Sequence, residues 1–325
     1  MTVPRRRFLR LAAGLAAVAV AEPQARAQAY PARPVRIIVA TTAGGSTDIA
    51  ARLIAQWLTQ RLGRSFIVEN RPGGNNNVGS ELAAHSPADG YTLFMANSVN
   101  SINTVLYRNL NYDFIRDFTP VVHVMSSPLL MMVHPSVPAR TVPEFIAYAK
   151  ANPDKITVGS GGNGSSGHMS AELFMMRTGV RLVHVPYHGE SAAMADLLGG
   201  QPQVLFATTG SSISFVKAGQ VRALAVTSPT RLAGLPDVPP MADFLPGYEA
   251  SGWSGLCAPK NTPAEIVALL NMQINRALAD PAIKGRMADM GGTAPGGSPA
   301  DFAGYIAGEI DKWRNVVAFA GIKLN

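Results

Sequence analysis

The 325-residue sequence has few of the features that catalytic and cofactor-binding sites require. Its single cysteine, Cys257, excludes an internal disulfide and an iron–sulfur cluster held by cysteines of this chain. Neither a Cys-x-x-Cys-His haem motif nor a Gly-x-Ser-x-Gly hydrolase motif occurs. His184 and His188 are four residues apart, but Pro186 breaks the helix that would place both on one face. We therefore expect a protein that is not an enzyme and that holds no cofactor and no metal.

Strong net charge is also missing once the N-terminal segment is set aside. Residues 1–29 contain five arginines and one acidic residue, so the formal net charge of +7 falls to +3 without them. A nucleic-acid-binding surface requires a basic stripe, and none remains in the sequence. No later apolar segment is long and uninterrupted enough to cross a membrane. We expect a soluble protein with no nucleic-acid partner.

The N-terminal segment has the form of an export signal. Arg5–Arg10 matches a twin-arginine pattern, and Leu11–Ala21 is an apolar run too short to span a bilayer. Ala27-Gln28-Ala29 fits a small-x-small cleavage site, with Ala25-Arg26-Ala27 as a rival. A general secretory signal with a chance arginine cluster is the alternative to the twin-arginine route. We expect residues 1–29 to be removed and the mature protein to be located in the periplasm.

The stretch Val35–Leu62 predicts a strand, a glycine-rich turn and a helix. It begins with β-branched residues, which are typical of a buried strand. Ser46 or Thr47 is suited to cap the helix, Asp48 to lie at the positive end of its dipole and Gly63 to end it. Such a turn presents backbone N–H groups to an anion, although an ordinary turn of an α/β core has the same sequence. We expect Asp48 to position the turn rather than to touch a ligand.

Strand and helix patterns alternate to the end of the chain. Residues 102–120 are predicted to be irregular, and two separate apolar runs, Val121–Met125 and Leu129–Val133, flank Ser126-Ser127-Pro128. Consecutive βαβ units predict parallel sheets with helices on both faces. Further strands are predicted over 65–69, 91–96, 156–158, 181–185, 203–206 and 221–226, and helices over 78–84, 169–176, 190–198, 262–279, 281–289 and 299–319.

Two crossings between these units predict two lobes with a ligand cleft between them. The predicted fold class is α/β, with two doubly wound lobes joined by a two-segment hinge near residues 126–130 and 250–256. The predicted segments are an export signal at 1–29, the first part of lobe 1 at 30–127, lobe 2 at 128–252 and the C-terminal part of lobe 1 at 253–325.

Five polar loops follow the carboxyl ends of predicted strands, where open α/β sheets hold ligands. They are rich in Gly, Ser, Thr and Asn and have few basic side chains, which suits a carboxylate better than a polyphosphate. Gly159, Gly161 and Gly164 match a dinucleotide-binding fingerprint, but the acid that should end the next strand is absent. Each loop by itself is more often an ordinary turn. The loops are 41–48, 72–77, 97–101, 159–168 and 207–212.

Together these motifs resemble the substrate-binding proteins of tripartite tricarboxylate transporters, the Bug family. The resemblance covers nearly all of residues 30–325 in order. It implies a type II-like periplasmic-binding-protein fold, a small organic carboxylate as ligand, and delivery to large and small integral-membrane permease components. The matching segments are Ala43-Gly44-Gly45-Ser46-Thr47-Asp48, Glu69–Gly74, Asp89–Leu93, Gly159–His168 and Val185–Gly189.

The resemblance also implies which residues hold the ligand. Its carboxylate is expected on backbone N–H groups, hydroxyls and ordered water of residues 42–48 and 161–166. The expected site residues are Thr42, Ala43, Gly44, Ser46, Thr47, Asp48, Asn76, Ser98, Gly161, Gly164, Ser165, Ser166, Tyr187, Ala207 and Thr208.

Two positions depart from the family pattern. The family often has Phe-Asp where this chain has Phe206-Ala207, and Lys where it has His188. We expect residue 207 at the cleft rim, where an aspartate could pair with a ligand ammonium and alanine cannot. This predicts an aliphatic di- or tricarboxylate or an aromatic acid without an amine. Two other functions stay open: a twin-arginine-exported enzyme with a bound organic cofactor, and a periplasmic ligand-sensor partner.

Overall fold

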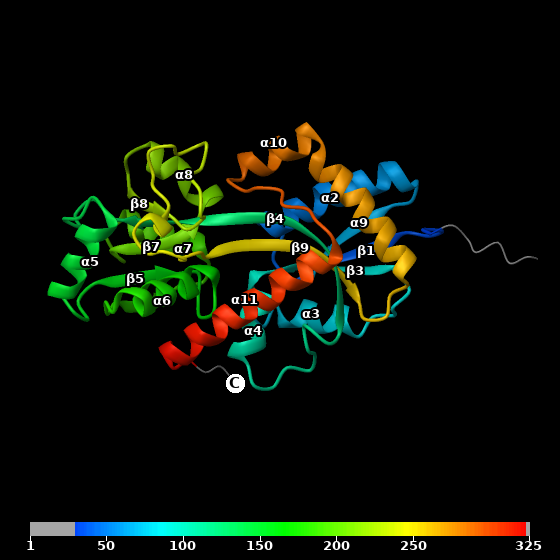
Figure 1. Ribbon diagram of the computed structural model, residues 1–325, viewed down its shortest axis with the longest axis horizontal. Coiled ribbons are helices and arrows are strands. Elements are labelled where there is room, and N and C mark those ends of the chain that lie inside the picture. The colour runs from blue at the N-terminus through cyan, green and yellow to red at the C-terminus, as the bar shows by residue number, and fades with distance from the viewer. Residues whose placement is uncertain (1–29, 323–325) are drawn as a thin grey trace, which may run out of the picture. The chain divides into compact units, whose positions relative to one another are not determined.

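The computed structural model describes residues 30–322, and Figure 1 shows how their helices and strands are arranged. The predicted export signal, residues 1–29, lies outside the described residues. The strands are β1 (Val35–Val39), β2 (Phe66–Asn70), β3 (Thr92–Asn97), β4 (Phe118–Val133), β5 (Thr157–Ser160), β6 (Val183–Pro186), β7 (Val204–Thr208), β8 (Arg222–Val226) and β9 (Ser251–Pro259). The helices are α2 (Ser46–Leu62), α3 (Asn77–Ala84), α4 (Ser98–Leu106), α5 (Val142–Ala151), α6 (Ser166–Thr178), α7 (Glu190–Leu198), α8 (Thr209–Lys217), the 3₁₀ helix η1 (Met241–Asp243), α9 (Ala264–Ala279), α10 (Pro281–Asp289) and α11 (Pro299–Ala320).

The strands of the described residues form one sheet in the order β2-β1-β3-β9-β4-β7-β5-β6, with β8 also paired to β4. Strands β2, β1 and β3 are parallel and β9 is antiparallel to β3; we call these four the first half-sheet. Strands β7, β5 and β6 are parallel, and we call them the second half-sheet. This arrangement confirms the predicted α/β fold class and adds antiparallel strands that the sequence patterns did not predict.

Strand β4 joins the two half-sheets. Its residues Phe118–Pro128 pair with β9, and Leu129–Val133 pair with β7 and β8. The two apolar runs noted in the sequence, Val121–Met125 and Leu129–Val133, are therefore parts of one continuous strand. Pro128 is tolerated in the strand because the ladder to β9 ends there, so its missing N–H breaks no internal pair. The division of the chain into two lobes stays a prediction.

Side chains of β4 alternate between two apolar clusters. Leu129 and Met131 pack in the cluster that includes α5, α6 and the end of α11. Leu130 and Met132 pack in the cluster that includes α7 and α8. Because helices cover both of its faces, β4 is apolar at consecutive positions, as buried strands are.

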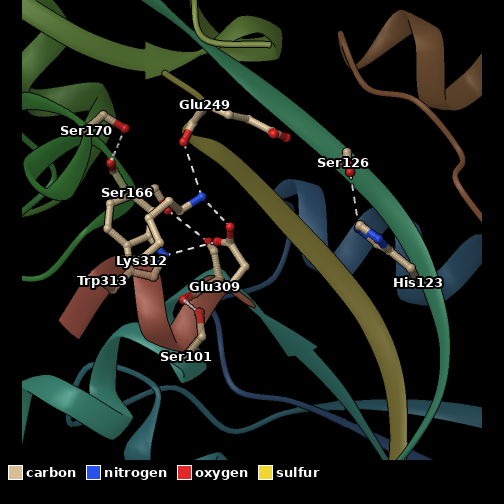
Figure 2. A network of polar contacts seen from close by, with 10 residues as sticks. Ser101, His123, Ser126, Ser166, Ser170, Glu249, Glu309, Lys312 and Trp313 are labelled. Atoms are coloured by element: carbon tan, nitrogen blue, oxygen red, sulfur yellow. Dashed lines mark hydrogen bonds and ion pairs between the residues drawn. The ribbon is translucent and has the colours of Figure 1, made fainter. Parts of the chain in front are cut away.

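Helix α11 packs against α4, β4 and α6, and Figure 1 shows its long course. Phe302 belongs to the apolar cluster of the first half-sheet and Trp313 to a cluster of the second. Between them, Glu309 accepts a hydrogen bond from Trp313 Nε1 at 3.0 Å and pairs with Lys312. Figure 2 shows that Lys312 Nζ also donates to the Glu249 carbonyl, ahead of β9. Helix α11 therefore ties the two half-sheets together on one side.

Each of the five predicted polar loops contains the first residue or the first turn of a helix, and two of them consist mostly of helical residues. Residues 98–101 belong to α4 and 209–212 to α8, and the supposedly irregular residues 102–120 contain the rest of α4 and the start of β4. Asn97 caps α4, because its side chain accepts the N–H of Val99 at 3.0 Å. Ser, Thr and Asn are favoured both in turns and at helix N-termini, so composition alone did not distinguish the two.

The start of α2 also differs from the prediction. Gly45 is the N-cap residue, α2 begins at Ser46, and no side chain caps it, so the predicted cap by Ser46 or Thr47 is wrong. Instead, Asp48 in the first turn accepts the N–H of Gly44 at 2.9 Å and holds the preceding turn. Gly63 ends the helix in the left-handed conformation, as predicted.

Candidate ligand-binding site

Residues from both half-sheets enclose a cavity of about 180 Å³, which we call the central cavity. All five polar segments singled out in the sequence contribute to it, because the carboxyl ends of β1, β3 and β7 converge there. The lining has no charged side chain. The lining residues are Thr41, Ser46, Thr47, Asn76, Asn97, Ser98, Val99, Ser127, Ser166, Thr208, Gly252, Trp253 and Ser254.

The structure brings some of the predicted site residues together and leaves others outside the lining. Those that line the central cavity are Ser46, Thr47, Asn76, Ser98, Ser166 and Thr208. Those that do not are Thr42, Ala43, Gly44, Asp48, Gly161, Gly164, Ser165, Tyr187 and Ala207. Thr42, Ala43 and Gly44 form the solvent-exposed outside of the first turn.

Helix N-termini converge on the central cavity. Helix α2 begins at Ser46, α4 at Ser98 and α6 at Ser166, and Thr208 is the N-cap residue of α8. The first N–H groups of a helix lack partners within it and lie at the positive end of its dipole. A small anion is therefore attracted here without a charged side chain. Ser98 Oγ and Ser166 Oγ lie 2.9 Å apart, so α4 and α6 begin in direct contact.

Two residues of the lining have buried polar atoms without a hydrogen-bond partner among the described residues. These atoms are Thr41 Oγ1 and Trp253 Nε1. Leaving a polar atom buried and unpaired costs about 1–3 kcal/mol. Such atoms are rare in folded proteins, and a bound molecule or an ordered water often supplies the partner.

Asp48 lies directly after the lining residue Thr47, but its side chain is buried and used within the first turn. It accepts hydrogen bonds from the N–H of Gly44, Arg52 Nε and Asn70 Nδ2, each at 2.9 Å. Burial alone would raise the pKa of Asp48, but these hydrogen bonds and the charge of Arg52 outweigh it, so the pKa is lowered. These contacts fit the predicted positioning role of Asp48.

The second glycine-rich turn, residues 159–168, is held by close contacts. Ser165 Oγ caps α6 by accepting the His168 N–H, and the Gly164 N–H donates to His168 Nδ1 at 3.0 Å. Gly164 has a φ of +74°, and a Cβ atom there would lie 2.6 Å from Leu106 Cδ2. Gly164 and Ser165 thus shape the turn rather than line the cavity.

Gly161 and Tyr187 also support the site from outside the lining. A Cβ atom at Gly161 would lie 3.1 Å from the backbone nitrogen of Glu190, so the second turn packs on the start of α7. The Tyr187 N–H donates to the Ser160 carbonyl at 3.0 Å, and Tyr187 Oη donates to the Gln201 carbonyl.

A pair of stacked histidines lies beside the second turn. The rings of His168 and His184 are 3.8 Å apart between centroids, with 18° between their planes. His184 Nε2 lies 2.6 Å from Ser160 Oγ, which donates to the Gly162 carbonyl, and His168 Nε2 lies 3.4 Å from Glu172 Oε1. Burial, together with the proximity of His168, lowers the pKa of His184 to about 4. The His184 ring is therefore neutral at neutral pH.

Ala207 is not at the rim of the cavity, contrary to the prediction. It is fully buried with Leu205 in the cluster that includes α7 and α8, whereas Phe206 belongs to the opposite cluster. Successive side chains of β7 point to opposite faces of the sheet, which imposes this orientation. Thr208, one residue further on, lines the cavity instead. The prediction of an amine-free ligand therefore loses its basis.

Sequence reasoning missed several residues of the lining. Thr41 and Asn97 lie in two of the polar segments that the rule on carboxyl ends of strands singled out, 41–48 and 97–101, but they were not among the expected site residues. Ser127 and Ser254 lie on β4 and β9, which pair over a long separation in sequence. No local pattern predicts that pairing.

Within residues 30–322, no helix is both long and apolar enough to span a bilayer. The same residues contain no group of three or more His, Cys, Asp or Glu side chains arranged to hold a metal ion.

Comparison with known proteins gives consistent matches. Residues 50–322 match the family described as tripartite tricarboxylate transporter family receptor. The chain is 36% identical over 301 residues to the protein BugT of Bordetella pertussis, covering 92% of each chain. It is similar to the solved structure of Rpa4515 of R. palustris with adipate, with a TM-score of 0.81, 36% identity and coverage of 90% of this chain and 99% of that one. It is also similar to MatC from Rhodopseudomonas palustris with bound malate, with a TM-score of 0.77, 31% identity and coverage of 89% and 100%. The chain therefore belongs to the tripartite tricarboxylate transporter receptor family, as the resemblance of its motifs predicted.

Proposed function

We propose that this protein is a receptor without catalytic activity that captures a small organic carboxylate in the central cavity. The observation that carries this proposal is the convergence of helix N-termini on a cavity whose lining is polar and uncharged. The unpartnered atoms Thr41 Oγ1 and Trp253 Nε1 add to it, because a ligand can supply their missing partners. The lining offers hydroxyl groups but no histidine or carboxylate to activate one as a nucleophile. Two similar structures hold adipate and malate, which are small organic carboxylates.

A thermal-shift screen of aliphatic and aromatic acids, followed by calorimetric titration, tests ligand capture. We expect at least one acid to bind at a single site and to raise the melting temperature, because binding to the folded state stabilises it. Ser98→Ala should weaken that binding, and the control Ser86→Ala should not, since the Ser86 hydroxyl donates to the Leu82 carbonyl and Ser86 is outside the lining. If no acid binds and the purified protein absorbs above 300 nm, the receptor proposal is wrong and a bound cofactor is indicated.

We further propose that the protein works in the periplasm and delivers its ligand to large and small permease components in the membrane. The family and the export signal of residues 1–29 support this. Cell fractionation and the intact mass of the mature protein are the test, with an N-terminus at Tyr30 expected. A retained N-terminus or a lipid adduct would contradict a freely diffusing receptor.

We also propose that the two half-sheets close around the ligand, with the hinge at residues 126–130 and 250–256. Strand β4 changes its pairing partner within the first of these segments, which supports a hinge there. Small-angle scattering with and without a verified ligand should show a smaller radius of gyration in the bound state. An unchanged profile at saturating ligand would argue against closure.

A further inference from the structure

An acidic side chain outside the sequence-predicted site stands directly behind one wall of the central cavity. Glu190 is the first residue of α7, and its carboxylate reaches the junction of β7 and α8. Glu190 Oε1 accepts hydrogen bonds from the Thr208 hydroxyl at 2.7 Å and from the Thr208 N–H at 3.2 Å. Its Oε2 lies 3.2 Å from the same N–H, and the Ser211 hydroxyl also donates to Oε1.

These contacts change what Thr208 can offer a ligand. Thr208 lines the central cavity, whereas Glu190 does not. The Thr208 hydroxyl and N–H are already directed at Glu190, and the Thr208 side chain does not cap α8. The Glu190 carboxylate therefore occupies the Thr208 donors and adds a negative charge beside the start of α8, so this helix N-terminus attracts an anion less than the starts of α2, α4 and α6 do.

No cation compensates this charge within the described residues. Glu190 has hydroxyl and amide donors as partners there and no ion pair with Lys, Arg or His. The wall formed by Ser46 and Thr47 differs, because these residues stand at the start of α2, which has no side-chain cap and therefore favours an anion. The cavity is thus electrostatically asymmetric. The start of α2 is suited to a carboxylate, and the Thr208 wall disfavours a second carboxylate.

We propose that Glu190 determines the ligand class: it selects a carboxylate whose far end is a hydrogen-bond donor and disfavours a second carboxylate at the Thr208 wall. The donor can be a hydroxyl, an amide or an ammonium, all of which differ from a carboxylate in having an O–H or N–H to donate. A second carboxylate there would meet a like charge at short range and find the Thr208 donors occupied. This inference depends on the proposed function, because it assigns the selectivity of the same cavity.

Calorimetric titration with matched ligands of equal length tests it. The two series are succinate, succinamate and 4-aminobutyrate, and adipate, adipamate and 6-aminohexanoate. In the better-binding series we expect the wild-type protein to prefer the monoamide or the amino acid over the diacid by roughly tenfold or more. This preference is measured on the unaltered protein, so it does not depend on whether a variant folds.

The variant Glu190→Gln removes the charge and keeps a side-chain oxygen as acceptor for Thr208. It should raise diacid affinity by roughly tenfold and reduce or reverse the preference. Glu144→Gln is the matched control, because Glu144 is also in the first turn of a helix but accepts the Arg140 N–H instead of a hydrogen bond from a lining residue, and it should leave all affinities within twofold. Diacid binding as tight as monoamide binding in the wild type, or an unchanged preference in Glu190→Gln, overturns the role of Glu190 while leaving carboxylate capture intact. Absence of binding by every acid to both proteins overturns the proposed function together with this inference.

Discussion

After β1 the chain turns through Gly44 and Gly45 in open space, whereas after β5 it turns through Gly164 and Gly167 against neighbouring atoms. A Cβ atom at Gly44 would meet nothing within 4 Å, and at Gly45 the nearest atom, the Thr42 carbonyl oxygen, would be 3.8 Å away. At Gly167 the same atom would lie 2.4 Å from the Phe206 carbonyl oxygen. The first turn is held by side-chain hydrogen bonds to Asp48, whereas the second combines side-chain hydrogen bonds with close packing against neighbouring residues.

The two turns also differ in their acids. Asp48 beside the first turn is paired with Arg52 and buried, so its charge is used within the fold. Glu190 beside the second turn has only neutral partners among the described residues, one of which lines the cavity. An acidic residue beside a binding site can therefore stabilise the fold or act on the ligand. Its hydrogen-bond and ion-pair partners indicate which of the two it does.

The largest effect that separates the two turns is expected from Gly167→Ala. The added Cβ would collide with the Phe206 carbonyl, a backbone atom that cannot rotate away, and α6 would be displaced from β7. We expect a loss of about 2–3 kcal/mol in the free energy of unfolding. Gly45→Ala is the control, because its φ is −75° and its surroundings are open, and it should cost much less. Urea denaturation measures both, and similar losses would contradict the difference between the turns.

Asp48→Ala removes the acceptor that holds the first turn. Gly44, Arg52 and Asn70 would each lose one hydrogen bond, and we expect a loss of about 2 kcal/mol in the free energy of unfolding. The exposed Asp311, paired with Arg314 on α11, gives the control variant Asp311→Ala, which should cost less than about 0.5 kcal/mol. Ligand preference should be unchanged in Asp48→Ala, since selectivity is assigned to Glu190. A changed preference would show that Asp48 acts on the ligand.

Acidification should weaken the second turn more than the first. Folding lowers the pKa of His184 from 6.5 to about 4, so the folded state favours the neutral ring. This contribution to stability is fully present above pH 6.5 and is lost as the pH falls from 6.5 towards 4. We expect a loss of about 1 kcal/mol at pH 5.5, reduced by solvent screening of the partly exposed ring.

Denaturation midpoints at pH 7.5 and 5.5 measure the effect for His184→Gln, with the exposed His188→Asn as control. Burial also lowers the pKa of His123 to about 4, which adds a parallel loss in every variant. His184→Gln should therefore show a smaller pH dependence than the wild type, and His188→Asn should not. An equal change of the denaturation midpoint between pH 7.5 and 5.5 in all three proteins would rule out His184 as the cause of the acid sensitivity.

The smallest effect is expected at the contact between the starts of α4 and α6, beside the second turn. Ser98 Oγ and Ser166 Oγ are 2.9 Å apart, a neutral contact worth about 0.5–1 kcal/mol. A double-mutant cycle with Ser98→Ala and Ser166→Ala should give a coupling energy of that size in the ligand-free protein. A coupling energy of zero would mean that the contact does not join α4 to α6 in solution. Figure 2 shows Ser166 further held through its carbonyl by Ser170, a bond that both variants retain.

The family, the α/β class and the convergence of the polar segments could all be predicted from the sequence. Consecutive strand and helix patterns require a mainly parallel sheet, and the carboxyl ends of its strands meet at one edge. This explains why segments as distant as those around Thr47, Ser98 and Thr208 all reach the cavity.

Local sequence does not show which residues of those segments line the central cavity, or which contacts stabilise each turn. Both depend on how elements that are distant in the chain pack together. Alternation in β7 buries Ala207 and exposes Thr208 to the cavity, and this depends on which face of the strand each neighbouring helix covers. The pairing of β4 with β9, which brings Ser127 and Ser254 into the lining, joins segments far apart in the chain. The contact of Glu190 with Thr208 likewise forms only when α7 packs beside β7, because no local pattern in the sequence relates the two residues.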